Sequence, residues 1–338
     1  MSSRSLVVLP DDSAKPIFEA IESASKSLRV KMFVFTDHGL LKAVIAARRR
    51  GVKVQVILNP ARKNGEEDNE ETRQALVQAR IDVRDGNPEF SLTHEKSMVV
   101  DDATAFVESL NWAPKNLTET RDYAVATSNA REVREIREAF EADWARQRFA
   151  PPADSHLIWC PGGRGSLLDF IDEARHSLFV QNERYQDPAV IERLVRAAVR
   201  GIKVRVMARP PHTLKPGKLG EGIGGLRILD DVGIKVHKLR HLRLHGKVLL
   251  ADGVAAIVGS INLTPGSFDD RRELAMIVRE EAVVERLQDV LREDWNSSHP
   301  LDLSDEGLLA DFDDRLDDAA KVPVRAPRGP GKRPERNR

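Results

Sequence analysis

The strongest constraint on the fold of this chain is an internal repeat in its sequence. The segment RRRGVKVQVILNP around Gly51 matches AVRGIKVRVMARP around Gly201, at an offset of 150 residues. Further on, THEKSMVVDD from Thr93 matches LHGKVLLADG from Leu244, at an offset of 151. This period is too long for a solenoid repeat, so it predicts two copies of one domain.

Both copies show the same succession of helical and strand patterns. Helices first alternate with β-branched runs, which predicts an α/β sheet with parallel strands. Two apolar runs then flank a tight turn, Asp101-Asp102 in one copy and Asp252-Gly253 in the other, which predicts an antiparallel hairpin. We therefore expect the α/β class, with a mixed sheet in each half. Predicted helices run from Lys15 to Ser27, Leu40 to Arg50 and Ala130 to Arg148, and again from Ser166 to Ser177, Pro188 to Arg200 and Glu280 to Trp295.

The same patterns predict the domain organisation. Residues 1–150 form the N-terminal half and residues 151–300 the C-terminal half. A tail, residues 301–338, is acidic at first and then rich in Lys, Arg and Pro, a composition typical of disordered segments.

Composition excludes several classes of protein. The 53 basic and 53 acidic residues cancel, so no basic field covers the whole molecule as in many nucleic-acid-binding proteins. The single cysteine, Cys160, excludes a disulfide framework and a cysteine-based zinc site. No apolar run approaches the length of a membrane span. We therefore expect a cytoplasmic protein, or one that contacts a membrane only at its surface.

Polar residues recur at matched positions in the hairpin of each half. His94 and Lys96 are two residues apart, so on a strand their side chains share one face. Ser109 and Asn111 follow on the returning strand, and Asp122 begins the next one. Each half thus offers a nucleophile or base, a cation, two neutral polar groups and an acid. The second half repeats the set as His245, Lys247, Ser260, Asn262 and Glu273.

Such a set suits the chemistry of a phosphodiester. Fixed cations and hydrogen-bond donors stabilise charge on the phosphoryl oxygens. A neutral imidazole can attack phosphorus and form a covalent intermediate, and a protonated one can give its proton to the leaving oxygen. A carboxylate on the far ring nitrogen fixes the tautomer of an imidazole. Two lysines supply positive charge, so the sequence predicts neither a metal nor another cofactor.

These residues resemble the phospholipase D superfamily. Its HxKxxxxD signature occurs twice, as His94-Lys96-Asp101 and as His245-Lys247-Asp252. Its GSxN element is present from Gly259 to Asn262, whereas the first half has Glu108 in place of the glycine. The resemblance implies a duplicated phospholipase D-like fold, in which two α/β halves related by a pseudo-two-fold axis share one active site.

The resemblance also implies roles for the residues. His94 becomes the phosphohistidine, and His245 acts as general acid and then as base. The phosphate is held by Lys96, Lys247, Asn111 and Asn262 with support from Ser109 and Ser260, while Asp122 and Glu273 orient the imidazoles. Asp101 and Asp252, at the turns, are expected to be structural.

The substrate stays open between two classes, and a third reading involves no catalysis. We expect an enzyme that cleaves or exchanges phospholipid headgroups, either a phospholipase D or a cardiolipin synthase-like transphosphatidylase, with a monomer sufficient for a complete site. The alternatives are a metal-independent nuclease and a non-catalytic phosphate-binding module. Zero net charge and few aromatic residues favour phospholipid over nucleic acid. The lipid reading requires peripheral contact with a membrane.

Overall fold

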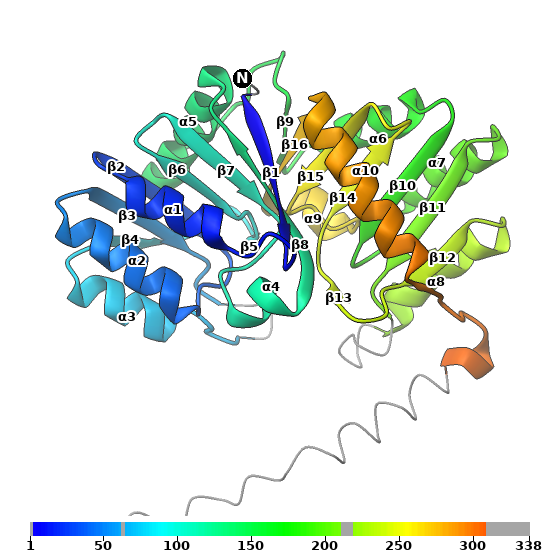
Figure 1. Cartoon of the computed structure of the whole chain (residues 1–338), viewed down its shortest axis with the longest axis horizontal. Helices are drawn as coiled ribbons and strands as arrows, with labels where there is room; N and C mark the ends of the chain where they lie inside the picture. Colours follow the sequence, from blue (N-terminus) through cyan, green and yellow to red (C-terminus); the bar gives the residue numbers. More distant parts are fainter. Residues whose placement is uncertain (1–2, 62–64, 211–218, 309–338) are drawn as a thin grey trace, which may run out of the picture.

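The computed structural model describes residues 3–61, 65–210 and 219–308, and it shows two similar halves side by side (Figure 1). The two halves repeat the same order of elements. The first contains β1 (Arg4–Leu9), α1 (Lys15–Ser23), β2 (Ser27–Met32), α2 (His38–Arg49), β3 (Lys53–Leu58), α3 (Glu70–Gln78), β4 (Asp82–Asp85), β5 (Leu92–Thr93), β6 (Ser97–Val100), β7 (Thr104–Glu108), α4 (Pro114–Thr118), β8 (Thr120–Thr127) and α5 (Ala130–Ala145). The second contains β9 (Leu157–Cys160), α6 (Arg164–Glu173), β10 (Ser177–Asn182), α7 (Pro188–Val199), β11 (Lys203–Ala208), α8 (Leu219–Asp231), β12 (Lys235–Lys238), β13 (Arg243–Leu244), β14 (Val248–Ala251), β15 (Ala255–Gly259), α9 (Pro265–Asp269), β16 (Arg271–Val278), α10 (Glu281–Asn296) and β17 (His299–Pro300).

Each half is built on one mixed sheet. The strand order β1-β8-β7-β6-β2-β3-β4 of the first half recurs in the second as β9-β16-β15-β14-β10-β11-β12, with β17 added at the outer edge. In the first sheet β2, β3 and β4 are parallel, while β6, β7, β8 and β1 are antiparallel. These sheets confirm the predicted α/β class with a mixed sheet in each half.

The repeated sequence produces repeated helices through the same local signals. In α2, the Asp37 side chain accepts a hydrogen bond from the backbone N–H of Leu40, and in α7 Asp187 does the same for Val190. Such N-caps satisfy backbone donors that a helix start leaves unpaired. Both helices then bury apolar residues three or four apart against their sheet, and both are followed by a glycine with positive φ, Gly51 or Gly201.

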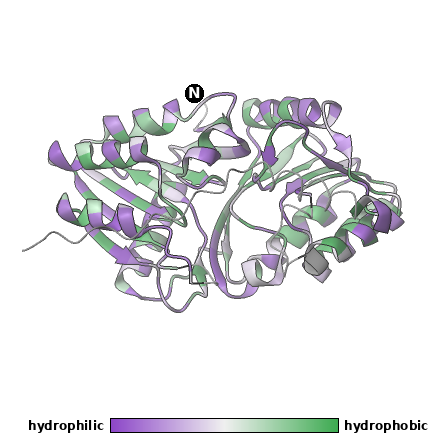
Figure 2. Cartoon of the chain, turned by 90° about the horizontal axis from the view of Figure 1, so that it is seen from below, coloured by the Kyte–Doolittle hydropathy of each residue, from purple (hydrophilic) through white to green (hydrophobic). Residues whose placement is uncertain are grey.

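The apolar core has three parts. One lies within each half, and a central one contains residues of both halves, among them Val8, Ile136, Val258 and Leu287. Helices α5 and α10 each bury a face in this central core, and Figure 1 shows α10 running along the junction. In Figure 2, apolar residues are concentrated on the strands and the inner helix faces. The halves therefore form one continuous interior.

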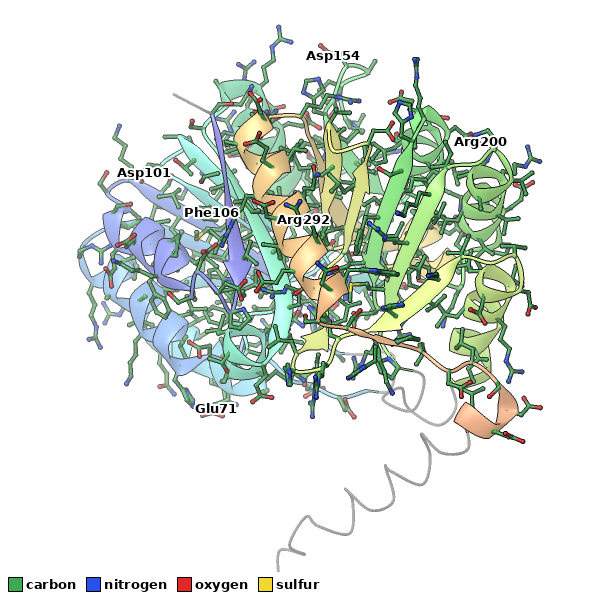
Figure 3. All side chains as sticks on the ribbon, turned by 45° about the vertical axis from the view of Figure 1, so that its right-hand side comes forward. Glu71, Asp101, Phe106, Asp154, Arg200 and Arg292 are labelled. Atoms are coloured by element: carbon green, nitrogen blue, oxygen red, sulfur yellow. The ribbon has the colours of Figure 1, made fainter. Side chains whose placement is uncertain are left out.

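The hairpin turns carry the acid of each HxKxxxxD motif. Asp101 adopts positive φ, and its carboxylate accepts hydrogen bonds of 2.7–2.9 Å from the backbone N–H groups of Ser25, Lys26 and Ser27. Asp252 holds the equivalent loop in the second half in the same way. Figure 3 shows Asp101 at the outer rim of the first half. The two acids thus join the hairpin to the preceding loop.

The start of the predicted tail contains buried leucines. Leu301 and Leu303 pack in the core of the second half, Leu308 is buried too, and the backbone N–H of Leu301 donates to the carbonyl of Val236. Alternating leucines give this short acidic stretch enough apolar surface to pack, which the composition of the whole tail concealed. Residues 309–338, including the basic stretch, lie outside the described residues. Within the ranges that the structure describes, no helix is long and apolar enough to cross a membrane.

The role of Asp101 predicts a measurable loss of stability. Burial alone would raise its pKa, but the three backbone hydrogen bonds lower it to about 2. The Asp101→Ala variant should lose about 1–2 kcal/mol of unfolding free energy at pH 7, since it removes hydrogen bonds to a charged group. In the native protein this stabilisation is complete above pH 3.8 and is lost as the pH falls through about 2.

Urea unfolding measures the difference. Asp154→Ala is the control, because the ion pair of Asp154 with Arg131 is exposed. Equal stability of the two variants would show that the Asp101 contacts do not stabilise the fold.

Candidate active site

Each HxK segment is held by the opposite half of the chain. Strand β5, just before His94, pairs in parallel with the start of β16, and β13, just before His245, pairs with the start of β8. The backbone N–H groups of His94 and Glu95 both donate to the carbonyl of Arg272, at 2.9 and 2.8 Å. His245 and Gly246 donate in the same way to Arg121, at 3.2 and 2.7 Å. These exchanged strands bring both motifs to the junction of the halves.

The exchange pairs each imidazole with the acid of the other half. Nδ1 of His94 lies 2.8 Å from Oε2 of Glu273, and Nδ1 of His245 lies 2.8 Å from Oδ1 of Asp122. The sequence predicted that these two acids orient the imidazoles, but it did not assign an acid to each histidine. That pairing depends on contacts between residues far apart in sequence.

Hydrogen bonds fix both acids. Ser109 donates to Asp122 and Ser260 donates to Glu273, each at 2.6 Å. Asp122 also accepts hydrogen bonds from Thr120 and from Asn116. Although Asp122 is one methylene shorter than glutamate, it reaches its imidazole.

The cations and amides of the motifs lie in the same place. Lys96 and Lys247 are buried, and each Nζ donates to the backbone carbonyl of the histidine two residues before it. Asn111 and Asn262 are buried too, and among the described residues their Oδ1 atoms have no hydrogen-bond partner. Besides burial, the charges of Lys96 and Lys247 lower the pKa of His94, so charged groups of both halves act on this imidazole.

Burial and charge determine the protonation of the first histidine. Burial, followed by the positive charges of Lys96, Lys247 and Arg271, lowers the pKa of His94 well below its ordinary value. Neutral imidazole is the nucleophilic form. Burial also lowers the pKa of Lys96 to about 7, against the opposing charge of Glu273. An anionic phosphate bound there would favour the protonated ammonium.

The departure from the GSxN pattern has a local explanation. Glu108 is buried and accepts a hydrogen bond of 2.8 Å from Nε1 of Trp112, and burial raises its pKa to about 8. At the matching position, Gly259, a Cβ atom would lie 2.3 Å from the carbonyl oxygen of Leu274. The first half has room for a side chain, and its glutamate is bound to an indole.

Sequence reasoning missed two residues of the site, Glu183 and Phe33. Oε2 of Glu183 lies 3.0 Å from Nζ of Lys247 and 3.8 Å from Nε2 of His245. Phe33, at the matching position of the first half, contacts the His94 ring edge to face, with 4.7 Å between centroids. The offset of 150 residues aligns these two residues with each other just after a buried strand, but it does not place them beside the histidines.

A buried ion cluster joins the halves behind the motifs. Nζ of Lys31 lies 2.8 Å from Glu95 and 2.6 Å from Asp143, and Asp143 also accepts two hydrogen bonds from Arg272 of the second half. Arg272 carries the carbonyl that receives His94, so the cluster fixes the position of this histidine.

The matching cluster has fewer charges. Gln181 and Gly246 replace the lysine and the glutamate, while Arg121 pairs with Asp294. The Tyr123 hydroxyl donates to Gln181 at 2.7 Å. A Cβ atom on Gly246 would lie 2.5 Å from the Tyr123 ring, so only glycine fits there.

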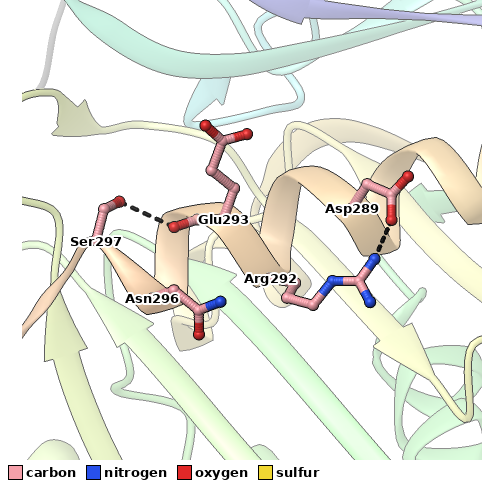
Figure 4. Close-up of a pocket in the computed structure, with 5 residues that line it drawn as sticks. All are labelled: Asp289, Arg292, Glu293, Asn296 and Ser297. Carbon is pink, nitrogen blue, oxygen red and sulfur yellow. Dashed lines mark hydrogen bonds and ion pairs between the residues drawn. The ribbon is translucent and has the colours of Figure 1, made fainter.

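A surface depression on α10 is unrelated to these groups. Its volume is about 390 Å³, and it is lined by the last turns of α10 and by Ser297, the residue that follows the helix (Figure 4). Arg292 pairs with Asp289 within it, and Ser297 donates to the carbonyl of Glu293. Within the described ranges, no group of three or more His, Cys, Asp or Glu residues is arranged to hold a metal ion.

Comparison with known families agrees with this geometry. The family model described as "Cardiolipin synthase, PLD-like domain" matches residues 17–144 and, a second time, residues 167–295. The chain belongs to this PLD-like family. The match confirms the resemblance to phospholipase D seen in the two motifs, and it places one copy of the domain in each half of the chain.

Similar proteins extend the comparison. Cardiolipin synthase B of Salmonella typhi is 25% identical over 321 residues, which cover 82% of this PLD-like chain and 76% of the synthase. The structure of phosphatidylserine synthase from Haemophilus influenzae Rd KW20 superimposes with a TM-score of 0.71 at 12% identity, over 94% of both chains. That of polyphosphate kinase from Porphyromonas gingivalis gives 0.69 at 14% identity, over 94% of this chain and 53% of the kinase, so the chain spans about half of that protein. These two superpositions show that this chain has the same fold as phosphatidylserine synthase and as the matched part of the kinase.

The ion cluster leads to a prediction about the junction. Asp143→Asn should lower the unfolding free energy by about 3–5 kcal/mol, because breaking a buried ion pair leaves charge uncompensated. Urea unfolding at pH 7 checks this. Asp289→Asn, which breaks the exposed pair with Arg292, should cost no more than about 1 kcal/mol. Similar small losses in both variants would contradict a stabilising role for the cluster.

Proposed function

We propose that this protein is a phosphodiesterase that cleaves or exchanges phospholipid headgroups through a phosphohistidine. The observation that carries the proposal is the pair of imidazoles with Nδ1 bound to an acid of the opposite half. This contact leaves Nε2 of each ring for chemistry. The similarity to cardiolipin synthase B supports a phospholipid as the substrate.

The reaction has two steps. Nε2 of His94 attacks phosphorus and forms an N–P bond, while the bond from phosphorus to the leaving oxygen breaks and that oxygen takes a proton from His245. His245 then removes a proton from water or an alcohol, whose oxygen displaces His94 from phosphorus. Lys96, Lys247, Asn111 and Asn262 stabilise the charge on the phosphoryl oxygens.

The first test uses lipid vesicles and mass spectrometry. The purified protein, with EDTA and glycerol, is incubated with vesicles of phosphatidylglycerol and phosphatidylcholine. Headgroup loss is expected from hydrolysis and headgroup exchange from transfer, and His94→Ala should abolish both. His245→Ala should slow turnover by about 10²–10⁴-fold, the usual contribution of general acid–base catalysis.

Three results would contradict the proposal. Full activity of the His94→Ala variant would show that His94 is not the nucleophile. Loss of activity in EDTA, with recovery on adding a metal, would contradict the metal-free mechanism. Unchanged lipid together with cleavage of single-stranded DNA would assign the site to nucleic acid.

The lowered pKa of His94 predicts the acidic limb of the pH profile. Attack requires the neutral imidazole, and the pH dependence of kcat/KM reports groups of the free enzyme. Because burial and nearby cations lower this pKa, the neutral form persists below pH 6.5, the ordinary value for histidine. The acidic limb should therefore lie below pH 6.5, as steady-state rates at constant ionic strength would show. A limb at or above pH 6.5 would contradict attack by His94.

A further inference from the structure

The two histidines occupy matching positions in unlike surroundings. The residue after β2 is Phe33, whose ring contacts His94, and Nζ of Lys96 lies 5.1 Å from the centroid of the same ring. The matching residue after β10 is Glu183, whose carboxylate faces His245 and Lys247. Phe33 and Glu183 thus form an aligned pair of unlike residues in contact with the lysines and histidines of the motifs.

The difference acts on the reactive nitrogen. Nδ1 of His245 contacts Asp122, and its Nε2 lies 3.8 Å from Oε2 of Glu183, so carboxylates lie on both sides of the ring. Two carboxylates stabilise the imidazolium over the neutral imidazole. Nδ1 of His94 likewise contacts an acid, but its neighbour Phe33 carries no charge.

Other charges around His245 come from each element packed against it. Lys247 follows it on the same segment, and His94 faces it from the first half. Positive charge here comes from Lys247 and from Arg184 and Arg209, which act on Glu183, and negative charge comes from Asp122 and Glu183. Glu183 is therefore a carboxylate beside His245 that has no counterpart beside His94, where Phe33 takes its place.

Glu183 is fixed in its ionised form. Its side chain is 9% exposed, and Oε1 lies 3.0 Å from Nη1 of Arg209. Burial alone would raise the pKa of Glu183, but the charges of Lys247, His245 and Arg209 hold it well below its usual value. The matching residue of the first half at the Arg209 position is Asn59, so the arginine too is particular to this side.

We propose that Glu183 is a positioning residue that makes His245 the proton donor and leaves His94 as the nucleophile. This inference rests on the proposed function, since it concerns the same two steps. In the first step, His245 gives its proton from Nε2 to the leaving oxygen. In the second, the carboxylate favours return of a proton from water or alcohol to the same nitrogen. The carboxylate of Glu183 thus determines which of the two histidines donates the proton and which attacks phosphorus.

The test compares Glu183→Gln with Phe33→Leu, the matched change on the other side. The pH profile of kcat/KM is measured on phosphatidylglycerol vesicles. For Glu183→Gln the basic limb should move to lower pH by about one unit, the usual effect of removing an opposite charge at this distance. That shift corresponds to a roughly tenfold lower rate above the limb. Phe33→Leu should leave the basic limb in place, and Glu183→Asp should restore it in part.

A second measurement follows the imidazole itself, because Glu183 also acts on Lys96. Histidine side chains labelled with ¹⁵N are titrated by NMR in the full chain without lipid, with His245→Ala to assign the signal. The His245 signal should titrate at lower pH in Glu183→Gln than in the unsubstituted protein, and at the same pH in Phe33→Leu.

The outcomes separate the two proposals. An unchanged His245 titration in Glu183→Gln overturns the role of Glu183, whatever happens to the rate. A shifted titration in a protein that leaves every phospholipid unchanged supports the role of Glu183 and rejects the lipid function. A lower rate with neither a shifted limb nor a shifted titration would show that Glu183 only shapes the site.

Discussion

The exchange of two short strands between the halves determines the rest of the site. Residues 92–93 pair with β16 and residues 243–244 pair with β8, and each arginine carbonyl there accepts two N–H groups from the opposite HxK segment. These backbone hydrogen bonds position the histidines independently of the side-chain contacts. The acids then follow, because each lies one residue beyond the arginine that receives the other half's histidine. A half by itself would contain all its motif residues and still lack the partner of its imidazole.

Burial makes this arrangement rigid and sets its electrostatics. The cluster of Lys31, Glu95, Asp143 and Arg272 balances two positive with two negative charges inside the protein, which a dry junction requires. The second cluster satisfies the same positions with an amide, a tyrosine hydroxyl and one main ion pair. The two clusters lie at equivalent places but contain different residues. What they share is that buried charges are paired and polar groups are hydrogen-bonded.

In the mechanism that we propose, the two halves of this duplicated chain have different tasks at one site. The shared scaffold supplies matching histidines, lysines, serines and asparagines, and these alone do not distinguish nucleophile from acid. In our proposal the distinction comes from residues outside the motifs, where Phe33 contacts one imidazole and Glu183 lies beside the other. Divergence after duplication has therefore changed the surroundings of the reactive groups more than the groups themselves.

The sequence by itself determined the duplication, the mixed α/β halves, the family and the identity of the motif residues, because these depend on periodicity and on local spacing. The tight turns at Asp101 and Asp252 were readable as well, because a turn depends on neighbouring residues, although the partners of the two carboxylates lie in a distant loop. Only the tertiary structure decided that acids and histidines pair across the halves, that Leu301 and Leu303 are packed, and that Glu183 belongs to the site. Each of these depends on contacts between residues distant in the chain, and spacing along a sequence carries no information about which distant surfaces meet.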